Sequence, residues 1–101
     1  MELRYSLTSP YARKVRAVAE IAGISTSIKL VESDTWDVPE ALYAVNPLGK
    51  IPALFLEDGS SLYDSRVICA YIDNLADAKL YPAPGPVLWE ALKDEALGDG
   101  I

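Results

Sequence analysis

The sequence lacks histidine and has a single cysteine, Cys69, and these two shortages exclude several kinds of site. Without histidine there is no histidine-based catalytic triad, and the usual nitrogen and sulfur ligands of zinc are not available. A lone cysteine cannot close an internal disulfide, so we expect a cytoplasmic protein rather than a disulfide scaffold. Cys69 itself is expected to be a small buried apolar residue. We expect no metal cofactor.

Long apolar runs and basic charge are also scarce. No stretch approaches the roughly 18 apolar residues that a membrane span needs, and no basic segment with an apolar run behind it opens the chain. Residues 51–101 carry three basic groups against nine acidic ones and hold the whole net charge of -6. A nucleic-acid partner would need a basic face, so we expect neither a nucleic-acid nor a membrane partner. The 101 residues, 50% of them hydrophobic, suffice for one core.

The first half of the chain predicts strands and helices in alternation. Residues 2–7 alternate as a strand does, and Ser9-Pro10 is typical of a helix start. That helix is expected to stop at Gly23. Its predicted apolar face is Tyr11, Val15, Val18 and Ala22. A strand over residues 27–31, with Ile28 and Leu30 on one side, a loop over 32–39 and a helical piece over 40–45 follow.

The second half predicts a hairpin and a further helix. Residues 52–56 and 61–63 are expected strands, joined by the tight turn 57–60. Asp64-Ser65 caps a helix whose predicted apolar stripe is Val67, Ile68, Tyr71, Ile72 and Leu75. The order β-α-β-α-β-β-α, read as two crossover units and one antiparallel hairpin, predicts an α/β sandwich.

A corner with two prolines, residues 46–54, stands before the predicted third strand. Pro52 has no amide donor and fits the first residue of a strand. If the Ile51–Pro52 bond is cis, the backbone groups of Ile51 turn outward and can bind an extended peptide. A tight turn with trans prolines is the alternative, and the local sequence leaves the choice open.

Residues 78–87 hold three prolines and a glycine, which is typical of a linker. A helix is expected from Leu88, with Trp89, Leu92, Ala96 and Leu97 at helical spacing. Its apolar face has no partner in the sequence, so we expect the chain to be truncated within a second, helical domain. The predicted division is therefore a domain over 1–77, a linker over 78–87 and the start of a helical domain over 88–101.

Three motifs in this order resemble the thioredoxin-like N-terminal domain of glutathione transferases, most closely the bacterial members. They are Ser9-Pro10-Tyr11, Gly49-Lys50-Ile51-Pro52-Ala53-Leu54 and Asp64-Ser65-Arg66. The resemblance implies a cis Pro52 and two backbone hydrogen bonds between Ile51 and the cysteinyl unit of glutathione. It also implies that Ser65 receives the γ-glutamyl carboxylate and that Asp64 pairs with the ammonium group. Lys50, with Ser33 or Asp34, is the candidate contact to the glycyl end.

The glutathione thiol must ionise before it attacks an electrophile, and a free thiol has a pKa of about 8.5. Ser9 is placed to donate a hydrogen bond to the thiolate at a helix N-terminus, with Thr8 as its rival. The residues alone favour a plain N-cap for Ser9. Tyr11 is expected to form a wall of the electrophile pocket, or else to pack in its helix. The basic residues Arg13, Lys14 and Arg16 suit either an anionic ligand or a solvated surface.

By this resemblance the protein is a glutathione transferase, with glutathione as co-substrate, a small electrophile and a homodimeric, detoxifying role. Isomerisation or dehalogenation by the same thiolate is one alternative, and a non-catalytic protein-interaction domain is another. Ser9-Pro10-Tyr11-Ala12 has no Cys-x-x-Cys, so dithiol redox chemistry is excluded. The 101-residue piece alone is expected to be a poor catalyst, because the helical domain completes the electrophile pocket.

Overall fold

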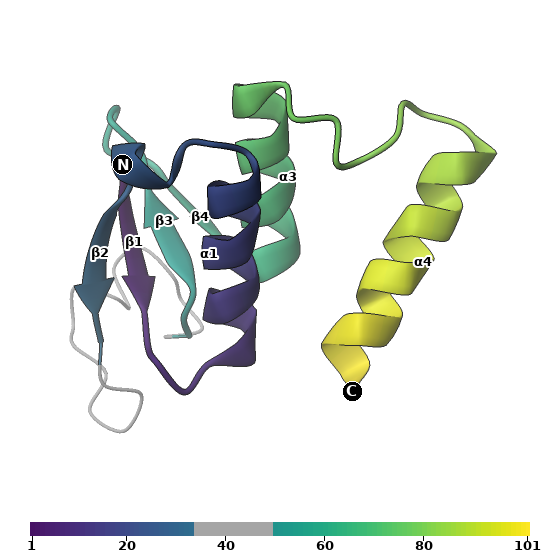
Figure 1. The fold of residues 1–101 in the computed structure, drawn as a ribbon. Helices are drawn as coiled ribbons and strands as arrows, with labels where there is room; N and C mark the ends of the chain where they lie inside the picture. Colours follow the sequence, from purple (N-terminus) through teal and green to yellow (C-terminus); the bar gives the residue numbers. More distant parts are fainter. Residues whose placement is uncertain (34–49) are drawn as a thin grey trace.

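The structure, a computed structural model, describes residues 1–33 and 50–101 and centres on one mixed four-stranded sheet (Figure 1). The strand order is β2-β1-β3-β4. The bounds are β1 Glu2–Tyr5, β2 Lys29–Glu32, β3 Ala53–Phe55 and β4 Ser61–Tyr63. The sheet and its helices confirm the α/β thioredoxin-like class. The predicted helical piece over 40–45, most of the 32–39 loop and Asp34 lie outside the described residues.

One part of the predicted topology is wrong. Strands β1 and β2 are parallel and joined through a helix, but β3 runs antiparallel to β1, and β4 antiparallel to β3. The described strands therefore form only one parallel crossover unit, where the sequence predicted two. Residue periodicity indicates that a strand exists but carries no information on its direction, which the pairing in the sheet determines.

The helix α1, Pro10–Ile21, begins and ends at the residues that the sequence indicates. The Ser9 hydroxyl oxygen accepts the amide of Ala12 at 3.1 Å. At the other end Gly23 has φ +77°, which a glycine adopts without steric cost. The amides of Gly23 and Ile24 donate to the carbonyls of Glu20 and Ala19, so the end is a Schellman motif. Both ends of α1 are therefore determined by a few neighbouring residues.

The buried face of α1 is rotated from the predicted one. Its buried residues are Ala12, Val15 and Ala19. Val18 and Ala22 are partly buried against the core, and Tyr11 is 43% exposed. The prediction relied on large side chains, whereas two of the three buried residues of α1 are alanines, Ala12 and Ala19. The observed buried face therefore differs from the predicted one.

The second predicted strand also starts late. Residues Ser25–Ser27 form a short 3₁₀ helix, η1, and β2 begins only at Lys29. Ile28, between them, is buried in the core, whereas Leu30 is 42% exposed. The two residues predicted to share one face are therefore in different environments. The first strand is likewise shorter than predicted, since it ends at Tyr5 and Leu7 is exposed.

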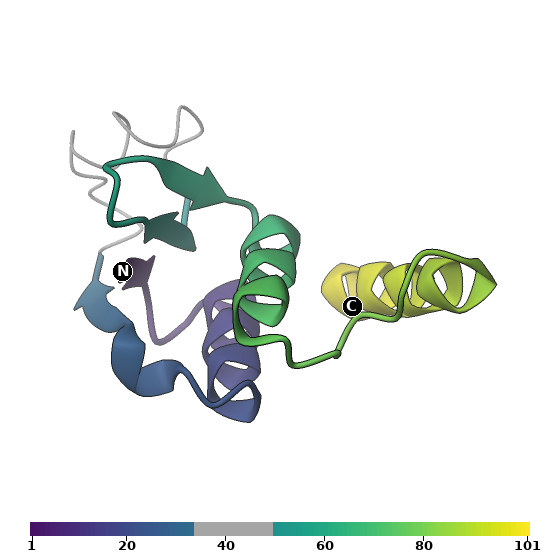
Figure 2. The ribbon, with the colours of Figure 1, turned by 90° about the horizontal axis from the view of Figure 1, so that it is seen from above.

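The helix α3, Ser65–Ala76, lies beside α1 on one face of the sheet, as both ribbon views show (Figures 1 and 2). The predicted Ile68, Cys69 and Ile72 are fully buried and pack with Leu3 and Leu54. Val67 and Leu75 were predicted in the same stripe but are about half exposed. Cys69 is therefore part of the core between the two helices and the sheet, whereas the larger side chains of Val67 and Leu75 are not.

The helix α4, Pro86–Gly100, stands beyond α1 and α3, on their side away from the sheet (Figure 2). It begins at Pro86 rather than Leu88, because proline suits the first position of a helix. None of its residues is buried; Trp89 and Leu97 are 64% and 67% exposed. No helix of the described residues is long and apolar enough to span a membrane. The division of the chain into two domains and a linker stays a prediction.

Candidate functional site

A cleft of about 450 Å³ opens between the sheet end, the start of α3 and the last turn of α4. It gathers segments that are far apart in the sequence. From the region around β3 and α3 come Lys50, Ile51, Pro52, Tyr63, Asp64, Ser65 and Arg66, and from the helices Tyr11, Ala96, Asp99 and Gly100. Six of the residues that the sequence singles out for binding or catalysis therefore line one cavity: Tyr11, Lys50, Ile51, Pro52, Asp64 and Ser65.

The wall at the sheet end is formed by Ile51 and Pro52, immediately before β3. The peptide bond between them is cis, the geometry that the resemblance implies. Pro52 is buried and Ile51 half-buried. Among the backbone hydrogen bonds of loops and turns in the described chain, none involves Ile51. The backbone of this residue thus borders the cleft at the point where β3 enters the sheet.

The start of α3 forms a second wall. Asp64 is the N-cap of the helix and adopts φ +65°, a region that residues other than glycine rarely enter. Its carboxylate accepts the backbone amide of Arg66 at 2.9 Å and the Nε of the same residue at 3.3 Å. The hydrogen bond from the Arg66 backbone amide, and then the contact with the Arg66 side chain, hold the pKa of the Asp64 carboxyl below its ordinary value. Ser65 is 5% exposed, at the first position of the helix.

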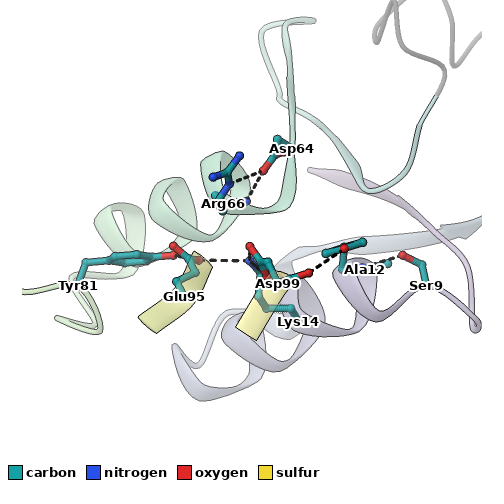
Figure 3. Close-up of polar contacts among 9 residues, drawn as sticks. Ser9, Ala12, Lys14, Asp64, Arg66, Tyr81, Glu95 and Asp99 are labelled. Atoms are coloured by element: carbon teal, nitrogen blue, oxygen red, sulfur yellow. Dashed lines mark hydrogen bonds and ion pairs between the residues drawn. The ribbon is translucent and has the colours of Figure 1, made fainter. Parts of the chain in front are cut away.

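Ser9 and Thr8 do not line the cleft, although Tyr11 of the same segment does. The Ser9 oxygen is the acceptor of the helix cap, so its own hydroxyl hydrogen stays available for donation (Figure 3). Thr8 is exposed and lies before the helix; its hydroxyl is 3.3 Å from that of Ser6. The two hydroxyls therefore differ in environment, since only Ser9 lies at the positive end of the helix dipole.

The sequence did not indicate the polar contacts that join α4 to α1 (Figure 3). Lys14 donates to both carboxylate oxygens of Asp99, at 2.8 and 2.9 Å, and to Glu95 at 3.3 Å. Tyr81 donates to the same Glu95 oxygen at 2.6 Å. Neither the anionic-ligand nor the solvated-surface interpretation of Lys14 holds, since its partners are carboxylates of the same chain. The spacing of Glu95 and Asp99, four residues apart on one helix face, is the one signal that pointed to such a contact.

Other predicted residues have structural contacts. Arg16 does not line the cleft; its guanidinium stacks over the ring of Tyr5 in β1 at 5.1 Å. Ser33 is buried, and its hydroxyl has no hydrogen-bond partner among residues 1–33 and 50–101. Burial raises the pKa of the Cys69 thiol to about 12, which leaves it protonated and unreactive. No cluster of three potential metal ligands occurs among residues 1–33 and 50–101.

Comparison with known proteins places this cleft in a family. Residues 8–75 match the family model described as the glutathione S-transferase N-terminal domain. A GST-like protein of Escherichia coli, YibF, is 36% identical over 103 residues, covering 100% of this chain and 50% of its own. A probable glutathione transferase of Aplysia californica is 31% identical over 85 residues, 84% of each chain.

Solved structures agree. A glutathione transferase family member from Pseudomonas fluorescens, crystallised with bound glutathione, has a TM-score of 0.90 and 40% identity, over 98% of this chain and 50% of that one. A glutathione S-transferase from Methylobacillus flagellatus with bound glutathione has a TM-score of 0.87 and 46% identity, over 98% and 48%. The chain spans about half the length of the Escherichia coli relative and of these two structures. Its sequence, its fold and its cleft thus agree on one assignment: the chain belongs to the glutathione S-transferase family.

Proposed function

We propose that the cleft binds glutathione and that the protein is a glutathione transferase, which activates the glutathione thiol for attack on a small electrophile. The observation that carries the proposal is the convergence of Lys50, Ile51, Pro52, Asp64 and Ser65 on one cavity, which Tyr11 closes from the side of α1. These residues come from separate motifs, and a fold stabilised by core packing alone does not require them to meet.

Glutathione is an extended tripeptide, and the cleft offers it complementary groups along its length. The backbone of Ile51 is positioned to pair with the cysteinyl unit in the manner of an added β-strand. Ser65, at the N-terminus of a twelve-residue helix, suits the γ-glutamyl carboxylate, because helix N-termini stabilise anions. The lowered pKa keeps Asp64 ionised at neutral pH, as a partner for the γ-glutamyl ammonium group must be. Lys50 is the candidate cation for the glycyl carboxylate.

The thiol is activated by Ser9 in this proposal rather than by Thr8. Only Ser9 combines a hydroxyl hydrogen with the positive end of α1, and both favour a thiolate. Lowering a thiol pKa by ~2 units needs about 2.7 kcal/mol, which a charge-assisted hydrogen bond and a helix dipole together supply. Ser9 lies outside the wall of the cleft, so the thiol must extend from Ile51 toward the start of α1.

The activity and assembly of the whole protein belong to the same proposal. The electrophile is placed on the Tyr11 side of the thiol, against the last turn of α4. A cytoplasmic homodimer with a detoxifying role fits the family and the single buried cysteine. A non-catalytic interaction domain is disfavoured, because such a domain has no need of Ser9, Ile51, Asp64 and Ser65 together.

Isothermal titration calorimetry with glutathione tests the proposal directly. We expect saturable binding by the chain, and at least a tenfold weaker affinity for Asp64→Asn, since a charged partner is lost. Asp58→Asn is the matched control: Asp58 also accepts a backbone amide two residues on, from Ser60, but lies in the β3–β4 turn away from the cleft. An absence of glutathione binding by the unsubstituted chain would refute the proposal, and equal losses in both variants would remove Asp64 from it.

A further inference from the structure

The last turn of α4 is attached to α1 by one cation shared between two carboxylates. The Nζ of Lys14 lies within hydrogen-bond distance of Asp99 and Glu95, which are contributed by a helix more than 80 residues further along the chain. The three side chains are 24%, 19% and 14% exposed. Within the described part of the chain, Lys14 is the only cation that forms an ion pair with either carboxylate.

A second line of contacts leads to the same place from the linker. Asp73 of α3 is 8% exposed and accepts the backbone amides of Leu80 and Tyr81, at 2.7 and 3.3 Å. The hydroxyl of Tyr81 then donates to Glu95. Tyr81 therefore links two contacts, since its backbone amide donates to buried Asp73 and its side-chain hydroxyl donates to Glu95, which also pairs with Lys14. In Figure 3 the side chains of Tyr81, Glu95 and Lys14 follow one another from the linker side toward α1.

These contacts end at the cleft. Asp99 lines it, together with Ala96 and Gly100, and these are the residues that α4 contributes to its wall. The hydroxyl of Tyr11 donates to the backbone carbonyl of Asp99 at 2.9 Å, so the last turn of α4 lies directly against the Tyr11 side of the cavity. Apolar packing does not hold α4 there, because no residue of this helix is buried in the described structure. The position of this wall therefore depends on the polar contacts.

We propose that Lys14 is a positioning residue, which acts through Asp99 and Glu95 to hold the last turn of α4 in place as the wall facing the group carried on the glutathione sulfur. The identity of the ligand rests on the proposed function, whereas the contact of Lys14 with Asp99 and Glu95 is independent of it. Removing the cation leaves two carboxylates at one partly buried site without their partner, and such a loss is costlier than the loss of an exposed pair. The wall then separates from α1 and Tyr11, while the glutathione groups around β3 and α3 keep their places.

Two measurements on the chain test the proposal, with the variants Lys14→Met, Lys14→Arg and Lys93→Met. The last is the matched control, because Lys93 pairs with Glu90 on the same helix at 2.9 Å but both side chains are 69% exposed. The first measurement is amide hydrogen exchange of residues 86–100 relative to α1. The second is calorimetric affinity for glutathione and for S-hexylglutathione, whose alkyl group extends from the sulfur into the cleft.

In Lys14→Met we expect exchange in α4 to accelerate at least tenfold, and affinity for S-hexylglutathione to fall at least fivefold more than affinity for glutathione. Lys14→Arg should restore both, since a guanidinium serves two carboxylates well, and Lys93→Met should change neither. A merely structural role would weaken both ligands equally. Unchanged exchange in α4, or equal losses of the two ligands, would overturn the assignment to Lys14. A failure of the unsubstituted chain to bind either ligand refutes the proposed function instead, and the exchange data then decide the contact alone.

Discussion

Replacing Ser9 separates the two functions that its side chain combines in the proposed enzyme, helix capping and thiol activation. Ser9→Ala removes the acceptor of the Ala12 amide, and the loss of such a cap costs about 1 kcal/mol of stability. For a domain of this size, that loss lowers Tm by roughly 4–8 °C. Ser9→Ala also removes the hydroxyl donor, whereas the helix dipole remains.

The effect on the thiol follows from the same geometry. A hydrogen bond to a charged group contributes about 1.5–3 kcal/mol, and each 1.36 kcal/mol is one pKa unit. The pKa of the bound glutathione thiol should therefore rise by about one to two units in Ser9→Ala. Ultraviolet absorbance of the thiolate, followed against pH on the glutathione complex, measures this shift. The affinity for glutathione should change little, because the remaining contacts lie around Ile51 and Ser65.

Ser9→Asp distinguishes the two roles. Aspartate is as good an N-cap as serine, so stability should return to that of the unsubstituted chain. Its carboxylate has no hydrogen to donate and carries a negative charge, so the thiol pKa should rise further than in Ser9→Ala. Thr8→Val, one residue away, should leave the thiol pKa unchanged. A thiol pKa that stays low in Ser9→Asp and rises in Thr8→Val would show that Thr8 is the donor and that our reasoning on Ser9 is wrong.

Three further outcomes follow from the contacts of the structure. Asp73→Ala removes the acceptor of the Leu80 and Tyr81 amides and should lower the free energy of unfolding in urea by about 1–3 kcal/mol. Asp94 is exposed, so Asp94→Ala should leave that free energy unchanged, and equal effects of the two substitutions would contradict the role of Asp73. Cys69 is fully buried with its pKa raised to about 12, so a thiol reagent at pH 8 should label it only after denaturant is added, and rapid labelling of the native chain would refute its burial. Burial alone would lower the pKa of Lys14, but its hydrogen bonds to Asp99 and Glu95 and the charge of Glu95 raise the pKa above its ordinary value. The contribution of Lys14 to the stability of the α1–α4 contact is therefore complete below about pH 10 and is lost as the pH rises through the raised pKa. Protection of the α4 amides, relative to the base-catalysed exchange of an unstructured chain, should fall in that alkaline range for the native chain and persist for Lys14→Arg, which does not titrate there; identical profiles would exclude Lys14 as the titrating group.

Local features of this protein are encoded in short stretches of its sequence. Ser9-Pro10 and Gly23 delimit α1 where expected, the turn over 57–60 joins β3 to β4, and Asp64 caps α3. Each depends on hydrogen bonds or backbone angles within a few residues, so the residue types suffice to predict it. The motifs that resemble glutathione transferases are also short, so each can be read from its own residues, and the fold then brings Ile51-Pro52 and Asp64-Ser65 to one cleft.

Features that depend on distant contacts did not follow from the sequence. The direction of β3 is set by pairing with β1, about 50 residues away, and periodicity is the same for either direction. The buried stripe of α3 includes Cys69 and excludes Val67 because the neighbouring α1 and sheet, not the size of a side chain, decide which positions are covered.

The sequence by itself determined the class of the fold, both ends of α1, the N-cap of α3 and six of the residues that meet in the cleft. Only the tertiary structure decided how α4 reaches that cleft, through Lys14, Glu95 and Asp99. The physical reason is that charged residues are compatible with solvent at any surface position. Their partners are selected by the distances that the folded chain establishes, and no local pattern records those distances.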